Sequence, residues 1–153
     1  MANWRFTCMR VIVGVVLVSS LRQYHIFISH SWDYDSQYQT IRGWLDRSSY
    51  FSCSDYSVPI TRPVDAAGNR ALKEKLGNRI AVSSCVIVLS GMYVAYSDWI
   101  DYEIDTALYY RKPIIGVRPW GQERVPLKVQ NSATVMVGWN SSSVIDAIRR
   151  FAL

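Results

Sequence analysis

The segment CVIVLS at residues 85–90 constrains the fold of this chain more than any other feature. It is short, continuously apolar and rich in β-branched residues, which is typical of a strand buried on both faces. Such strands occur in parallel sheets that helices cover on both sides. The segment therefore predicts an α/β protein.

The rest of the chain reads as strands alternating with helices. We expect strands at 24–29, 51–58, 82–90, 113–117 and 133–137, the second being the least regular. We expect a first helix from a cap at Asp33 or Asp35 to about residue 47, and a second helix at 69–81. A third helix should run from a cap at Ser97 or Asp98 to about residue 112, and a last one from a cap within 141–143 to 151. A loop that contains Pro and Gly is expected after residue 117. This order predicts a flavodoxin-like, doubly wound parallel sheet of five strands, ordered 2-1-3-4-5, with helices on both faces.

Apolar spacing predicts which helix faces lie on the sheet. Residues three and four positions apart share one face of a helix. The expected inward residues are Tyr38, Ile41, Trp44 and Leu45 in the first helix, and Ile100, Ile104, Ala107 and Leu108 in the third.

Composition excludes several classes of protein. The chain has 153 residues, of which 50% are hydrophobic and 19% charged, as in one globular domain. Residues 24–153 keep only two of the five net positive charges, which is too few for a nucleic-acid surface. Three scattered cysteines form no disulfide framework, and Cys85 is an expected core residue. His25 and His30 have no evident third ligand, so no metal site is expected.

The first 23 residues form a basic and hydrophobic extension before the domain at 24–153. Arg5 and Arg10 precede an apolar run at 11–18, and small polar residues follow. The pattern is typical of a secretory signal peptide, and the run is shorter than the roughly 20 residues of a membrane-spanning helix. A membrane-associating arm and an extension that packs on the domain remain the alternatives.

Ligands of doubly wound sheets bind beyond the carboxyl ends of the strands, here the loops at 29–35, 58–68 and 90–99. The third helix places Trp99 and Glu103 four residues apart on one face, with Tyr110 near them. Glu103 can be a partly desolvated carboxylate at the rim of the cleft, able to hold ribose hydroxyls or stabilise a cationic transition state. The alternative is an ordinary boundary glutamate of an amphipathic helix.

Three blocks together resemble the TIR-like domains of bacteria. They are YHIFISHSWDYDSQ at 24–37, SCVIVLSGMYVAYSDWI at 84–100, and the spacing of Ser97, Trp99 and Glu103. The resemblance covers about residues 24–118 and continues more weakly to the end. The SHSW start is similar to members associated with the Thoeris anti-phage system.

The resemblance implies an enzyme that processes NAD⁺ as a substrate, without a cofactor. Glu103 matches the glutamate that catalytic members need to break the bond between nicotinamide and ribose. The products would be ADP-ribose or a cyclic isomer. The resemblance places residues at the nucleotide: Ser29, His30, Ser31 and Trp32 in the first loop, and Ser97 and Trp99 before and in the third helix.

The loop after the second strand departs from the family pattern. VPITRPVDAAG lacks the usual RD…PG arrangement, and either Arg62 or Asp55 could serve in its place. A local hydrogen bond of His30, a helix cap at Ser97 and rim packing of Trp32 and Trp99 remain alternatives to ligand contacts.

Several other functions have to be compared with the sequence. A non-catalytic TIR-like interaction module is the main alternative. A phosphorylation receiver would need an acid ending the third strand and a lysine ending the fifth, and neither is present. The motifs GxxxxGK[ST] and GxSxG are absent, and HSWDYDS has no glycine to wrap a flavin phosphate.

By analogy we expect a cytoplasmic homo-oligomer whose product acts on a separate effector, or a secreted or membrane-associated protein if residues 1–23 direct it there.

Overall fold

The computed structural model describes residues 22–29, 35–58, 66–121 and 125–153. Five strands form one parallel sheet of order β2-β1-β3-β4-β5, which confirms the predicted fold class. The strands are β1 (Gln23–Ser29), β2 (Ser52–Asp55), β3 (Cys85–Leu89), β4 (Ile114–Arg118) and β5 (Val135–Gly138). The helices are α1 (Asp35–Asp46), α2 (Ala66–Val82), the 3-10 turn η2 (Ser90–Met92), α3 (Tyr93–Tyr109), α4 (Leu127–Ser132) and α5 (Ser141–Phe151).

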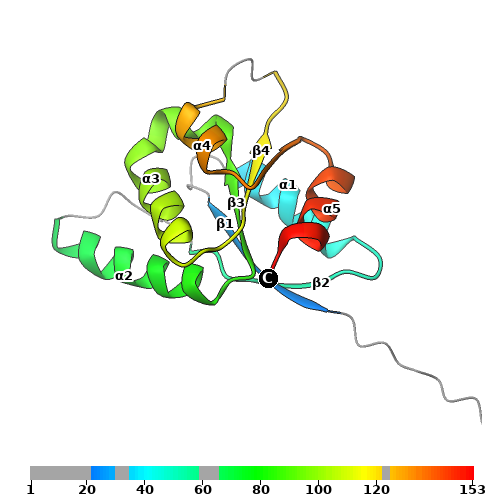
Figure 1. Cartoon of the computed structure of the whole chain (residues 1–153), viewed down its shortest axis with the longest axis horizontal. Helices are drawn as coiled ribbons and strands as arrows, with labels where there is room; N and C mark the ends of the chain where they lie inside the picture. The colour runs from blue at the N-terminus through cyan, green and yellow to red at the C-terminus, as the bar shows by residue number, and fades with distance from the viewer. Residues whose placement is uncertain (1–21, 30–34, 59–65, 122–124) are drawn as a thin grey trace, which may run out of the picture.

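The helices cover the sheet in two layers. Figure 1 shows α2, α3 and α4 on one side and α1 and α5 on the other, and α2 and α4 both contact α3. All five residues of β3 are buried, as the apolar segment predicts. Every N–H and C=O of a central strand finds its partner within the sheet, so such a strand can be apolar on both faces at no hydrogen-bonding cost.

The expected start of the third helix and the expected loop after β4 need correction. The third helix begins at Tyr93, because η2 leads from β3 directly into it, and Ser97 and Asp98 therefore lie inside the helix and do not begin it. The loop after β4 contains a helix, α4, that six residues are too few to reveal as a periodic pattern.

The inward faces are largely as predicted. Ile41 and Leu45 are buried, with Tyr38 and Trp44 packed against the core. Ile100, Ile104 and Ala107 are also buried, but Leu108 is 48% exposed. Leu108 follows Ala107 by about 100° around the helix, which carries its side chain off the sheet and into solvent.

Candidate active site

The carboxyl ends of the strands meet at one edge of the sheet. β1 ends at Ser29, beside Val88 of β3, and Leu89 of β3 pairs with Val117 of β4. Ser90 Oγ donates a hydrogen bond to the Val117 carbonyl oxygen at 3.1 Å, which fixes the end of β3 to β4. This edge is where ligands of doubly wound sheets bind.

Glu103 is buried beneath this edge. Its residue exposure is 3%, and among the buried residues of the described part it is the one with an ionisable carboxyl. α3 turns this position toward the sheet on the same side as Ile100, Ile104 and Ala107, which are all buried. Glu103 is therefore buried more deeply than the partly desolvated rim position that the sequence predicts, and it lies on the core-facing side of the helix.

Ser29 supplies the hydrogen bond to this carboxyl. Burial raises the pKa of Glu103 to about 7, and the hydrogen bond from the Ser29 side chain partly opposes that rise. A hydrogen bond donated by a hydroxyl stabilises the ionised carboxyl, whereas loss of water destabilises it. The pair therefore holds an acid that changes charge close to neutral pH.

Asp55, at the end of β2, belongs to a different cluster. Burial alone would raise the pKa of Asp55, but hydrogen bonds from Ser57 and Tyr38 and the charge of Arg42 outweigh burial and lower that pKa. The Arg42 Nε atom lies 3.6 Å from Asp55 Oδ2, and the Ser57 N–H donates to Oδ1 at 2.8 Å. The Ser57 hydroxyl accepts from the Ile28 N–H at 2.9 Å, so the cluster joins α1 and β2 to β1.

The sequence matches one protein family. A model described as "Thoeris protein ThsB, TIR-like domain" matches residues 27–124. The chain belongs to this family. The match confirms the predicted TIR-like relationship, and it spans both Ser29 and Glu103.

A solved structure agrees on the fold. The structure of the CMP N-glycosidase BcmB of Clostridium botulinum superposes with a TM-score of 0.51, over 82% of this chain and 98% of that chain, at 11% sequence identity. A likeness at this identity concerns the fold alone. No curated protein matches the sequence.

Only part of the predicted TIR-like site lies in the described residues. Ser29 and Glu103 are brought together. His30, Ser31, Trp32 and Arg62 lie outside the described residues, as does the side chain of Ser97.

Trp99 lies one helical turn before Glu103 and is half-buried against the core. The Lys73 Nζ atom of α2 lies 6.0 Å from the centre of its ring, and the Tyr102 hydroxyl donates to the Lys73 carbonyl oxygen at 2.7 Å. These contacts make Trp99 part of the packing between α2 and α3. Tyr110, expected near Glu103, is 42% exposed and packs edge-on against Tyr109.

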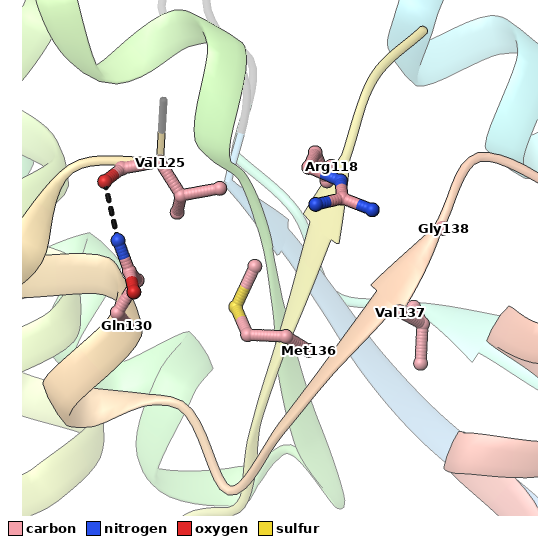
Figure 2. Close-up of a pocket in the computed structure, with 6 residues that line it drawn as sticks. All are labelled: Arg118, Val125, Gln130, Met136, Val137 and Gly138. Atoms are coloured by element: carbon pink, nitrogen blue, oxygen red, sulfur yellow. Dashed lines mark hydrogen bonds between the residues drawn. The ribbon is translucent and has the colours of Figure 1, made fainter. Parts of the chain in front are cut away.

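Sequence reasoning missed a pocket at the carboxyl ends of β4 and β5 (Figure 2). Its volume is about 390 Å³, and it is lined by Arg118, Val125, Gln130, Met136, Val137 and Gly138. The available signal in the sequence is Arg118, a charged residue at the end of the otherwise apolar strand β4. Pattern analysis could not find the remainder, because Gln130 belongs to the short helix α4.

Proposed function

We propose that this TIR-like domain cleaves the N-glycosidic bond between nicotinamide and ribose in NAD⁺, with Glu103 as the catalytic carboxylate. The observation that carries the proposal is the buried Ser29–Glu103 pair at the carboxyl edge of the sheet. Burial of a carboxylate is costly unless it is paired and hydrogen-bonded, and groups with strongly perturbed pKa values cluster at functional sites.

The chemistry suits one carboxylate. The carbon–nitrogen bond breaks, nicotinamide leaves as a neutral ring with the electron pair, and positive charge develops on the ribose. The carboxylate stabilises that charge and can hold the ribose hydroxyls. Water then forms the new carbon–oxygen bond and loses a proton to solvent, which gives ADP-ribose, or a nucleophile within the substrate closes a cyclic isomer.

The charge of the substrate favours the reactive form of Glu103. The nicotinamide ring of NAD⁺ is cationic, and a nearby cation stabilises a carboxylate. Substrate binding should therefore promote ionisation of an acid whose pKa is about 7 in the free protein. The proposed substrate contacts are His30, Ser31 and Trp32, together with Arg62 and Ser97. Trp99 would support them from the rim.

Incubation of the purified protein with NAD⁺, followed by chromatography and mass spectrometry, tests the proposal. We expect nicotinamide release by the wild type and its loss in Glu103→Gln, which keeps the shape and removes the charge. Glu74→Gln is the matched control, because Glu74 is exposed on α2. Retained turnover in Glu103→Gln would contradict the assignment. CMP belongs in the same assay, because BcmB is a CMP N-glycosidase.

The second candidate is a non-catalytic interaction module. Silence toward NAD⁺ and CMP, persisting with a crowding agent or an extract of infected cells, together with full biological activity of Glu103→Ala, would favour it. If the enzyme is active, we propose that it works as a homo-oligomer in the cytoplasm and that its product signals to a separate Thoeris effector. Among the described residues, no helix is long and apolar enough to cross a membrane.

A further inference from the structure

Helix α4, which lines the pocket through Gln130, lies on the same side of the sheet as α3, the helix that carries Glu103 (Figure 1). The volume of the pocket, about 390 Å³, falls in the range of small-molecule sites. Figure 2 shows Val125, Gln130 and Met136 around the space between α4 and β5, with Arg118 at the carboxyl end of β4. The lining of the pocket thus combines the apolar side chains of Val125 and Met136 with polar groups, among them one cationic side chain.

Arg118 gives the pocket its preference for anions. It is the one charged residue among the described lining residues, and its side chain is exposed. No ion pair joins it to any residue in the described ranges. An arginine fork donates paired hydrogen bonds to phosphate or carboxylate oxygens. The position is therefore suited to a phosphate group.

Gln130 adds a directional acceptor. Its Nε2 atom donates to the Val125 carbonyl oxygen at 2.6 Å, which fixes the orientation of the amide. The Oε1 atom is then left as an acceptor at the pocket, since an amide oxygen offers two lone pairs. An exocyclic amino group on a planar base is the complementary donor, and Met136 and Val125 provide apolar surface for its ring.

The pocket is within reach of the Ser29–Glu103 pair along the same edge. Arg118 pairs with Gly138, one residue beyond the pairing of Leu89 with Val117. Two strand spacings of about 4.8 Å and two residues of about 3.3 Å separate the Cα atoms of Ser29 and Arg118 by roughly 12 Å. One dinucleotide can therefore span both positions.

We propose that Arg118 binds a phosphate of the nucleotide substrate and that the pocket formed by Val125, Gln130 and Met136 takes the adenine at the end remote from the scissile bond. This assignment rests on the proposed function, which it extends from the bond broken to the part of the substrate that is recognised. Gln130 selects the amino group of the base, and Arg118 selects the charge of the phosphate.

Binding of AMP and of IMP, measured by calorimetry, tests the pocket without any turnover. IMP replaces the amino group of AMP with a carbonyl oxygen. We expect the wild type to bind AMP about tenfold more tightly than IMP, and Gln130→Met to bind the two alike. Arg118→Gln should weaken AMP binding about tenfold or more, whereas Arg150→Gln, exposed on α5, should not change it.

Kinetics then connects the pocket to the reaction. Arg118→Gln should raise the KM for NAD⁺ about tenfold with kcat nearly unchanged, and should leave cleavage of nicotinamide riboside, which has no phosphate, as in the wild type. AMP binding that is absent, or unchanged in Arg118→Gln, would overturn the inference even if NAD⁺ is cleaved. If the protein binds AMP specifically but cleaves neither NAD⁺ nor nicotinamide riboside, the proposed reaction is wrong and the nucleotide pocket is still supported.

Discussion

At the scale of single residues, Glu103 is the least expected feature of the core. The folded protein buries this acid on a helix face that also carries the buried Ile100 and Ile104, and Ser29 provides a hydrogen bond to its carboxyl. Desolvation of a carboxyl favours its neutral form. The site is therefore built at some expense of stability, as is common where a residue is kept for function.

This cost predicts a pH-dependent effect of Glu103→Gln on stability. The pKa of Glu103 is about 7 in the folded protein and 4.5 ordinarily. Between these pH values the folded protein keeps a proton that the unfolded chain has released, so stability falls as the pH rises through this window. A glutamine at this position does not ionise, so it does not lose stability as the pH rises. We expect the stability advantage of the variant to be small near pH 5 and to grow above neutral pH, to as much as roughly 3 kcal/mol.

Urea unfolding at pH 5 and pH 8 measures this difference. Glu74→Gln is the control, because the exposed Glu74 gains nothing from neutralisation. A Glu103→Gln protein that is equally stable or weaker than the wild type at pH 8 would show that the carboxyl is not desolvated as described.

Ser29→Ala should move the pH profile of catalysis. The Ser29 hydrogen bond lowers the pKa of Glu103, so its removal raises that pKa further. If the carboxylate is the active form, the acid limb of kcat/KM should shift to higher pH, with activity restored in alkaline buffer. Ser84→Ala is the control, since Ser84 is also buried but accepts from the His25 N–H near the start of β1. If the acid limb of kcat/KM does not move in Ser29→Ala, the ionisation of Glu103 does not control the reaction.

At the scale of elements, most of the sheet could be predicted from the sequence. The strand β3 is apolar throughout, and its parallel partners follow from helices between the strands. The helix boundaries were harder to predict. Ser97 and Asp98 have the preferences of capping residues, but η2 starts α3 four residues earlier, where the backbone leaves β3. Tertiary structure thus overrides local propensity there.

The start of α5 offers a test of such capping. The expected cap lay within residues 141–143, but the N-cap is Asn140, whose side chain accepts from the Ser143 N–H at 2.9 Å. Asn140→Ala should cost about 1 kcal/mol of stability, because one N–H of the first turn loses its partner. Ser141→Ala should cost much less. Thermal unfolding of both variants measures the two losses of stability. Equal losses would show that Asn140 is not the capping residue.

The pairing of Ser29 with Glu103 could not be predicted from the sequence. Spacing identified Glu103 as a candidate, and the end of β1 identified Ser29, but neither pattern says that the two side chains meet. That contact depends on how α3 lies across β1 and β3, which side-chain packing determines. The pocket at Arg118 has the same origin, since β4, α4 and β5 each contribute to it.

At the scale of the whole molecule, the family match and the fold have different limits. The match ends at residue 124, whereas β5 pairs with β4 through Ile115–Val135 to Arg118–Gly138. The last strand and α5 therefore complete the sheet beyond the matched region. At the other end, Arg22 Nη2 donates to the Ala152 carbonyl oxygen at 2.9 Å, which brings the start of β1 to the end of α5.

These terminal contacts make the boundary of the domain testable. A variant that begins at Arg22 keeps the hydrogen bond to Ala152, the pairing of Gln23 with Ser52 and the stacking of Tyr24 on Phe51, whose ring centres lie 5.1 Å apart. It should retain the stability of the full chain to within about 0.5 kcal/mol in urea unfolding. A variant that begins at His25 loses the buried Tyr24 and should be weaker by roughly 2–3 kcal/mol. If the first variant is as weak as the second, residues 1–21 pack on the domain. If it is not, mass spectrometry of the protein from its host separates a signal peptide, with a mature start near Leu21, from an arm that keeps its first residues.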